Sequence, residues 1–182
     1  MADEVWLLRH AETEWSRTGR HTGRTDIPLT DEGRRVAQAL RPRLEGHAFA
    51  LVLCSPLMRA RETASLAGLE CSGLRDDLLE WDYGEYEGIT TPQIREQRPD
   101  WYLWTDGAPG GESPDEVAAR CDRVTLTLPK LNASHRILLV VTGAEKAPML
   151  ARVIAGPDPD VPASLLDRGR LEIVADAAAL DG

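Results

Sequence analysis

The sequence lacks any apolar run that approaches about 20 residues, the length at which a helix crosses a bilayer, and it opens on acidic residues rather than on the basic start of a signal peptide. We therefore expect a cytoplasmic protein that does not bind membranes. Cysteine is scarce as well. Cys54, Cys71 and Cys121 are odd in number and widely spaced, which argues for a reduced compartment and against a disulfide scaffold or a zinc site.

The chain is also short of positive charge. Its 182 residues carry 21 Lys and Arg against 30 Asp and Glu, so the formal net charge is -9 at pH 7. This balance argues against a nucleic acid as partner, although a local basic pocket can exist inside an acidic shell. The length suits one domain with a substantial buried core.

The first chemically informative stretch is residues 5–8, Val-Trp-Leu-Leu, followed by Arg9 and His10. An apolar run without a period predicts a strand buried on both faces, and α/β folds present their chemistry at the carboxyl ends of such strands. An imidazole can attack phosphorus, and a guanidinium can hold two phosphate oxygens in a fork. Taken alone, such a pair is more often a solvated strand end.

The residues that follow favour the chemical interpretation. Residues 9–16, Arg-His-Ala-Glu-Thr-Glu-Trp-Ser, resemble the signature of the histidine phosphatase superfamily, the phosphoglycerate-mutase-like proteins. Ala11 stands where the family has glycine, and Ser16 stands where an asparagine often follows the tryptophan. The resemblance implies that His10 is phosphorylated in turnover, and that Thr13 and Ser16 contact the phosphate or the substrate.

Two further stretches continue the resemblance in the family's order. The polar loop at residues 19–30 contains Thr22 and Gly23, which the resemblance places against the phosphate. The apolar residues 49–54 predict a second buried strand. The strand runs into Ser-Pro-Leu-Met-Arg-Ala-Arg-Glu-Thr-Ala, a second family motif, which implies that Arg59 is the second guanidinium on the phosphate.

Residues 78–88 are rich in acidic and aromatic side chains. Apolar neighbours favour the protonated form of a carboxyl group, which a general acid requires. The stretch matches the family's Glu-x-x-Tyr-Gly-x-x-x-Gly pattern, which implies that Glu80 is the proton donor. Glu85 and Glu87 are expected at the surface or rim. The alternative for the whole stretch is a solvated acidic loop.

Two helix starts can also be identified. Thr30, followed by two acidic residues, predicts a helix from residue 31 to near Gly46. Ser113, followed by Pro-Asp-Glu, is a capping box with proline at the first helical position, and it predicts a helix through residue 120. The resemblance implies that residues 92–112 form a lid that sets substrate preference.

The pattern changes beyond residue 122. The strand predicted at residues 136–141 ends in Thr142 and Gly143, where the phosphatase family carries its second catalytic histidine followed by glycine. Residues 120–182 resemble instead the C-terminal part of the phosphogluconolactonases, in phrases such as Val-Thr-Gly-Ala-Glu-Lys-Ala. That likeness implies a phosphate-binding role for Lys146, next to Thr142 and Gly143.

These observations predict a single α/β domain over residues 1–182. We expect a three-layer α/β/α sandwich with a mostly parallel central sheet, as in the phosphoglycerate-mutase-like proteins. Residues 1–122 would form a histidine-phosphatase-like part, and residues 123–182 a phosphogluconolactonase-like part that completes the sheet. Such a chain is a chimera of two layered α/β parents.

The function that the resemblance implies is phosphomonoester hydrolysis, or mutase-like phosphoryl transfer, through a phosphohistidine. His10 attacks in line, Arg9 and Arg59 neutralise the developing charge, and Glu80 protonates the leaving oxygen. Because Thr142 replaces the second histidine, we expect impaired activity. We expect four of the residues to converge at the carboxyl edge of the sheet, namely Arg9, His10, Arg59 and Thr142.

The alternatives are a phosphate-binding scaffold with weak or no catalysis and, with most of its parent missing, a 6-phosphogluconolactonase. His21 is the other histidine that can approach the site, although such a residue is more often a loop histidine than a catalyst. We expect no metal and no organic cofactor. The expected partner is a small phosphorylated metabolite or inorganic phosphate. The sequence indicates neither the physiological substrate nor the oligomeric state.

Overall fold

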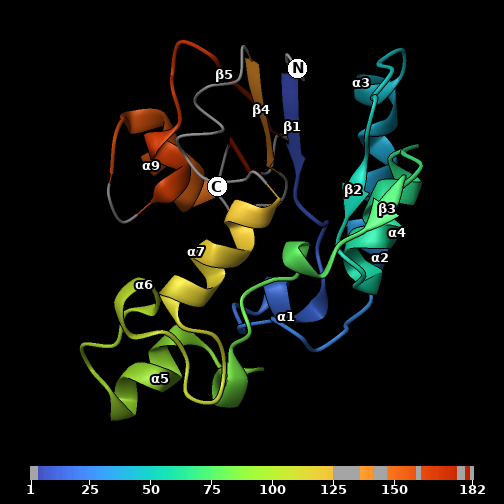
Figure 1. Ribbon diagram of the computed structural model, residues 1–182. Coiled ribbons are helices and arrows are strands. Elements are labelled where there is room, and N and C mark those ends of the chain that lie inside the picture. The colour runs from blue at the N-terminus through green and yellow to red at the C-terminus, as the bar shows by residue number, and fades with distance from the viewer. Residues whose placement is uncertain (1–3, 125–135, 142–146, 159–160, 176–178, 181–182) are drawn as a thin grey trace. The chain divides into compact units, whose positions relative to one another are not determined.

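The computed structural model describes residues 4–124, 136–141, 147–158, 161–175 and 179–180 (Figure 1). The chain divides into two compact units, one formed by Met1–Arg9 with Thr125–Gly182 and the other by His10–Val124. The prediction of a single domain remains a prediction, and each unit is described by itself.

The first unit is built on a parallel sheet of the strands β1 (Glu4–Leu8), β4 (Arg136–Val141) and β5 (Leu171–Ala175), with β4 in the middle (Figure 1). The strands predicted at residues 5–8 and 136–141 are therefore confirmed. Ile137 lies opposite Val5 on one side and Leu171 on the other. Its side chain is fully buried, so the apolar run of β4 forms the core of this sheet.

The same unit contains the helix α9 (Ala147–Ala155) and the short 3-10 helix η4 (Pro162–Leu165). Ala147, Leu150 and Val153 are buried and recur every three residues, which is the spacing of one helix face. The helix ends before Gly156. This residue has a φ of 142°, which glycine adopts readily and other residues rarely adopt.

The second unit, His10–Val124, is mainly helical. Its only strand pair among the described residues is β2 (Leu53–Cys54) with β3 (Gly73–Leu74), again parallel. Its helices and 3-10 turns are α1 (Glu14–Arg17), α2 (Asp31–Ala39), α3 (Arg41–Leu44), α4 (Met58–Leu66), η1 (Asp76–Leu78), η2 (Gly84–Tyr86), α5 (Thr91–Gln97), α6 (Leu103–Asp106) and α7 (Pro114–Arg123).

Both predicted helix starts are confirmed. The Thr30 hydroxyl accepts a hydrogen bond from the Gly33 N–H at 3.0 Å. At the start of α7, the Ser113 hydroxyl accepts from the Glu116 N–H at 3.3 Å, and the Glu116 carboxylate accepts from the Ser113 N–H at 2.8 Å. These bonds satisfy N–H groups that have no partner inside the helix.

Two predicted elements differ from the structure. The helix expected from residue 31 to near Gly46 is divided into α2 and α3, because Pro42 has no N–H and its ring opposes the carbonyl one turn earlier. The strand expected at residues 49–54 is only Leu53–Cys54, because its parallel partner β3 is equally short. The α/β class with parallel strands is confirmed, and the described ladders form two sheets.

Candidate active site

The backbone beside His10 is tied to the helix that carries Arg59. The Ala11 N–H donates to the Thr63 hydroxyl at 3.0 Å, and that hydroxyl donates to the Arg59 carbonyl at 2.7 Å. Ala11 and Thr63 are both buried. A single threonine, one helical turn beyond Arg59 in α4, therefore fixes the turn after His10 relative to Arg59.

The His10 ring has an assignable tautomer. Its Nδ1 lies 2.7 Å from the Ala11 carbonyl oxygen. A carbonyl only accepts, so Nδ1 carries the proton and donates. In the neutral ring the lone pair is then on Nε2.

Arg59 is almost completely buried, with 1% of its surface exposed. Its guanidinium donates to the carbonyls of Gly23 at 2.8 Å, Thr25 at 3.0 Å and Thr22 at 3.2 Å. A buried cation needs such acceptors to offset its lost hydration. Arg59 therefore holds the loop at residues 22–25, which contains Thr22 and Gly23, two of the expected phosphate contacts.

The opposite side of this loop is held by Glu87. Its carboxylate accepts from the N–H groups of Gly23 at 2.8 Å, Arg24 at 2.9 Å and Thr25 at 3.4 Å. The expectation of a surface or rim residue therefore misses its main contact. The role could not be read from the sequence because the partners lie more than 60 residues away.

Gly23 brings this loop against the segment of Glu80. A Cβ at Gly23 would lie 2.1 Å from the Trp81 carbonyl oxygen and 2.4 Å from Glu87 Oε1, distances that only glycine avoids. The loop backbone therefore packs directly on the residue that follows Glu80. The Glu80 carboxylate itself accepts from the Trp81 N–H at 2.8 Å.

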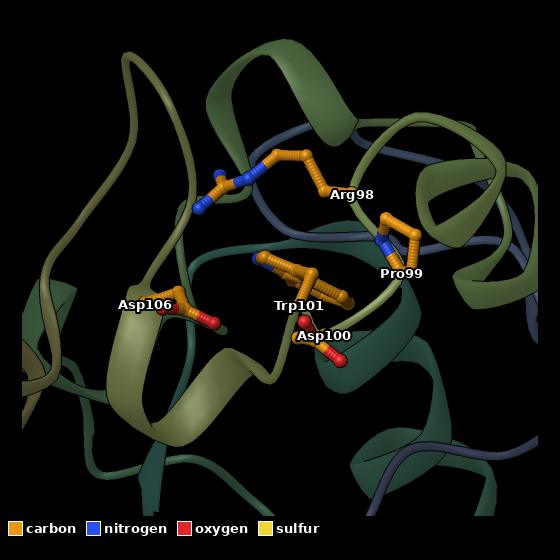
Figure 2. Close-up of a pocket in the computed structure, with 5 residues that line it drawn as sticks. All are labelled: Arg98, Pro99, Asp100, Trp101 and Asp106. Atoms are coloured by element: carbon orange, nitrogen blue, oxygen red, sulfur yellow. The ribbon is translucent and has the colours of Figure 1, made fainter.

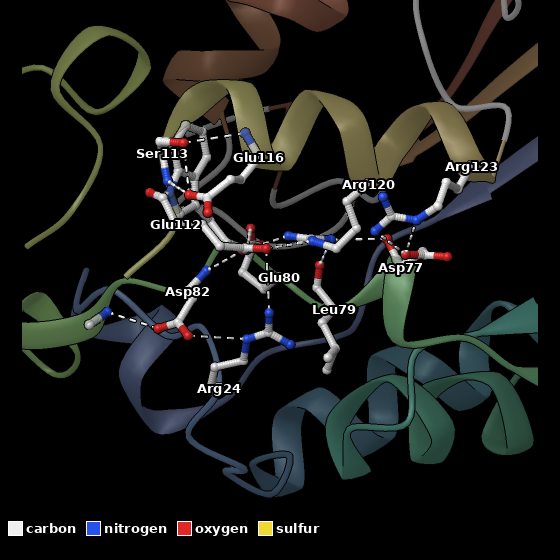
Figure 3. A network of polar contacts seen from close by, with 12 residues as sticks. Arg24, Asp77, Leu79, Glu80, Asp82, Glu112, Ser113, Glu116, Arg120 and Arg123 are labelled. Carbon is white, nitrogen blue, oxygen red and sulfur yellow. Dashed lines mark hydrogen bonds and ion pairs between the residues drawn. The ribbon is translucent and has the colours of Figure 1, made fainter. Parts of the chain in front are cut away.

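A buried ion pair lies beside the Glu80 segment (Figure 3). Arg120 donates Nε and Nη2 to the two oxygens of the Glu112 carboxylate at 2.7 and 2.8 Å. Burial would raise the pKa of Glu112, but hydrogen bonds from Arg120 and from the Asp82 N–H hold that pKa below its usual value. The pair is therefore charged at neutral pH.

Arg24 extends this network toward solvent (Figure 3). Its guanidinium lies 3.4 Å from the Glu112 carboxylate and 3.5 Å from that of Asp82. Its side chain is about two-fifths exposed, at 38%. Such long, partly solvated ion pairs contribute little stability, so Arg24 can exchange them for a bound anion at small cost.

His21 lies in an aromatic cluster. Its ring stacks on Tyr83 with centroids 4.6 Å apart and meets the edge of Trp101 at 5.5 Å. Its Nε2 is 3.1 Å from the Thr91 hydroxyl. Burial lowers the pKa of His21. The negative charges of Glu80 and Glu87 act to raise it, but the effect of burial is larger. The ring is therefore neutral at pH 7 and packs in the aromatic cluster, and the expectation that it is not a catalyst stays a prediction.

The expected hydroxyl contacts have backbone partners in the structure. Thr13 is fully buried, and its N–H donates to the Ser16 hydroxyl at 2.9 Å while its own hydroxyl accepts from the Ser16 N–H at 3.2 Å. This reciprocal pair caps α1. The Thr22 hydroxyl donates to the Arg20 carbonyl at 3.1 Å. Their contacts to phosphate stay predictions.

Within the unit His10–Val124, Thr63 links the backbone next to His10 to that of Arg59, and Arg59 holds the loop at residues 22–25. Gly23 in this loop packs on the carbonyl of Trp81, next to Glu80. Arg9 belongs to the other unit, where it is exposed. Thr142, Gly143 and Lys146 lie outside the described residues. Within the part of the chain that the structure describes, no three His, Cys, Asp or Glu side chains gather as a metal site, and no helix has the length and apolarity to cross a membrane.

A separate surface pocket of about 260 Å³ lies between α5 and α6 (Figure 2). Its lining residues are Arg98, Pro99, Asp100, Trp101 and Asp106. Trp101 is buried and donates its indole N–H to the Gly107 carbonyl at 2.9 Å. The lining includes none of His10, Arg59 and Glu80, so the pocket lies apart from these candidate residues.

The chain matches one family profile over most of its length. This family is described as the histidine phosphatase superfamily (branch 1), and the match covers residues 5–173. It continues past residue 122 and includes most of the part that resembles phosphogluconolactonases. The comparisons give no support for a separate lactonase-like segment there.

Individual proteins agree with the family match. The chain is 45% identical over 154 residues to an acid phosphatase of Mycobacterium tuberculosis. The aligned region covers 83% of this chain and 75% of that protein. It is 33% identical over 159 residues to sedoheptulose 1,7-bisphosphatase of Saccharomyces cerevisiae. The aligned region covers 71% of this chain and 57% of the yeast protein. The solved structure of the open reading frame Rv3214 of Mycobacterium tuberculosis has a TM-score of 0.66 at 41% identity, and the match covers 88% of this chain and 83% of that one.

Proposed function

The chain belongs to the histidine phosphatase superfamily, and from that premise we propose that it hydrolyses phosphomonoesters through a phosphohistidine on His10. The observation that carries the proposal is the geometry of this ring. Its Nδ1 donates to the Ala11 carbonyl at 2.7 Å, which leaves the Nε2 lone pair for attack on phosphorus.

In the first step, His10 Nε2 forms a bond to phosphorus while the bond from phosphorus to the leaving oxygen breaks. The electron pair goes to that oxygen, which takes a proton from Glu80. Arg9 neutralises the charge on the phosphoryl oxygens. Arg59 donates to the carbonyls of the loop at residues 22–25 and adds positive charge from behind that contact. In the second step, the Glu80 carboxylate accepts a proton from water, and the water oxygen displaces His10 to release inorganic phosphate.

The substrate class we propose is small phosphorylated metabolites. Two relatives support it by their names, an acid phosphatase and a sugar bisphosphatase. The exposed guanidinium of Arg24 lies next to the Glu80 segment, where it can hold a second anionic group of a substrate. The net charge of -9 disfavours polyanions such as nucleic acids.

We propose that turnover is impaired because Thr142 stands where the family has its second catalytic histidine. A missing donor to the transferring phosphoryl group costs about a hundred- to a thousand-fold in rate. Lys146 can add positive charge and hold phosphate. However, a group that binds the ground state and the transition state equally does not raise turnover. A phosphate-binding protein with little catalysis is the corresponding alternative.

The test is detection of the phosphoenzyme. The protein is mixed with 2,4-dinitrophenyl phosphate, quenched, and examined by mass spectrometry for acid-labile phosphate on His10. The expected result is a phosphorylated His10 peptide in the unmodified chain and none in His10→Ala. His47→Ala is the matched control, because His47 is an exposed histidine beyond α3. Equal hydrolysis by His10→Ala and the unmodified chain would overturn the proposal, and a lactone substrate in the same assay tests the phosphogluconolactonase alternative.

A further inference from the structure

The segment that carries Glu80 has little regular structure of its own. It follows the single turn of η1, Asp76–Leu78, and residues 79–83 belong to no helix or strand. An irregular segment keeps one conformation only where its backbone groups find fixed partners. The position of the proposed proton donor therefore depends on the side chains that bind this segment.

Arg120 binds the segment immediately before Glu80. Its Nη1 donates to the Leu79 carbonyl at 2.8 Å and to the Asp77 carbonyl at 2.9 Å (Figure 3). The Leu79 carbonyl belongs to the peptide group that leads into Glu80. Rotation of that peptide would swing the Glu80 side chain, and the hydrogen bond from Arg120 opposes the rotation.

Glu112 binds the segment immediately after Glu80. Its carboxylate accepts from the Asp82 N–H at 2.9 Å, and its carbonyl accepts from the indole N–H of Trp81 at 2.8 Å. Its own N–H donates to the Asp82 carbonyl at 2.9 Å. The two residues that follow Glu80 are therefore both held by Glu112.

The two residues that hold the segment are themselves fixed to each other. Their side chains are 8% and 16% exposed, and the guanidinium of Arg120 meets the carboxylate of Glu112 through two parallel hydrogen bonds. Glu112 directly precedes the capping box of α7, and Arg120 lies inside that helix. The pKa of Arg120 is raised, first by Glu112 and also by the charge of Glu80, so Arg120 and Glu80 are within electrostatic reach.

We propose that Arg120 and Glu112 are positioning residues that hold Glu80 where it can protonate the leaving oxygen. The proposal rests on the proposed function, in which Glu80 is the acid. General acid catalysis contributes about a hundred- to ten-thousand-fold where the leaving oxygen is basic. It contributes little where the leaving group departs as a stable anion. Loss of the positioning pair should therefore affect the two kinds of substrate differently.

The experiment compares 2,4-dinitrophenyl phosphate, which has a stable leaving anion, with phenyl phosphate, which needs a proton. Phosphoenzyme formation is measured in single turnovers for the unmodified chain, Arg120→Lys, Glu112→Gln and Glu80→Gln. Lysine keeps the charge at residue 120 but loses the planar fork that reaches Glu112 and Leu79 together. The matched control is Arg123→Lys, which alters an exposed arginine on the same helix that pairs with the Asp77 side chain at 2.7 Å.

For Arg120→Lys we expect a rate loss of about ten- to a hundred-fold with phenyl phosphate and less than about threefold with dinitrophenyl phosphate, as for Glu80→Gln. Glu112→Gln should change the ratio of the two rates in the same direction, and Arg123→Lys should leave it unchanged. If circular dichroism shows that Arg120→Lys does not fold, the ratio of the two rates in Glu112→Gln alone tests the positioning role. Equal losses on both substrates, or none, would overturn the positioning role. Failure of the proposed function is recognised separately, because no phosphorylated His10 would then form with either substrate.

Discussion

The guanidinium of Arg59 and the carboxylate of Glu87 hold opposite sides of one loop, residues 22–25. Arg59 donates to its carbonyls and Glu87 accepts from its N–H groups, so each side of the loop backbone meets a charge of complementary sign. Hydrogen bonds to charged groups are about twice as strong as those between neutral groups. These hydrogen bonds therefore hold the loop backbone in one conformation. A binding site whose backbone is already ordered loses less affinity to ordering when its ligand binds.

Glu87→Gln should destabilise the protein and weaken substrate binding. The amide has one acceptor oxygen where the carboxylate has two, so an N–H group of the loop loses its partner or faces the amide NH₂. We expect a loss of about 1–3 kcal/mol in the free energy of unfolding, measured by urea denaturation, and a raised KM. Glu85→Gln is the control because Glu85 is exposed. An equal effect of both variants would show that Glu87 does not hold the loop.

Gly23→Ala should displace the loop although it adds only one methyl group. The new Cβ would meet the Trp81 carbonyl at 2.1 Å, and a backbone oxygen cannot move aside as a flexible side chain can. Overpacking of this kind costs about 1–3 kcal/mol, and we expect the activity to fall with the stability. Gly73→Ala is the matched control, since its Cβ would have no neighbour closer than 3.9 Å. Thermal unfolding of the two variants provides the comparison.

The local features of this fold could be predicted from the sequence. Thr30 and Ser113 identify helix starts because a cap involves only residues three positions apart. The apolar run of β4 identifies a buried strand for a similar reason. His10 and Glu80 could be predicted as candidate site residues because they lie within short motifs that resemble a known family.

The contacts that organise the site could not be predicted in this way. Glu87 meets Gly23 across 64 residues, and Arg120 meets Leu79 across 41. Neither residue has a neighbour in sequence that reveals its partner, and an isolated glutamate or a helical arginine most often faces solvent. Hydrogen bonds that close long loops depend on the whole fold, so they become visible only in the structure.

His21 should make stability depend on pH. Its pKa in the folded protein is lowered by burial from the ordinary value of 6.5. Below about pH 6.5 the unfolded chain therefore binds more protons at this position than the folded one. The stabilising contribution is fully present above that pH and is lost as the pH falls through the lowered pKa.

The check is a series of urea denaturations from pH 7.5 to pH 5 on the unmodified chain and on His21→Phe, which keeps the aromatic stacking on Tyr83 but does not titrate. We expect the slope of stability against pH to be smaller in the variant over this range. Turnover should persist in His21→Phe, since the ring is a packing element. Loss of turnover in a folded variant would instead assign His21 a catalytic part.

Thr142→His tests the proposal that Thr142 stands where the family has its second catalytic histidine. A threonine hydroxyl is a neutral donor on a short side chain, whereas a histidine can reach further and can donate as a cation. If a missing donor limits the phosphoryl transfer, its restoration should raise kcat by about a hundred- to a thousand-fold. KM should change much less, because the gain arises in the transition state.

The comparison uses Thr142→His, the unmodified chain and His10→Ala, with phenyl phosphate as substrate and released phosphate as the measured product. His10→Ala sets the background, and the double variant His10→Ala with Thr142→His shows whether the new imidazole acts as a nucleophile on its own. A rise in kcat that requires His10 supports an impaired phosphatase in which Thr142 is the defect. Family-level turnover in the unmodified chain, with no further gain from Thr142→His, would mean that other groups already supply the missing donor, and Lys146→Ala would then be the variant expected to lose activity.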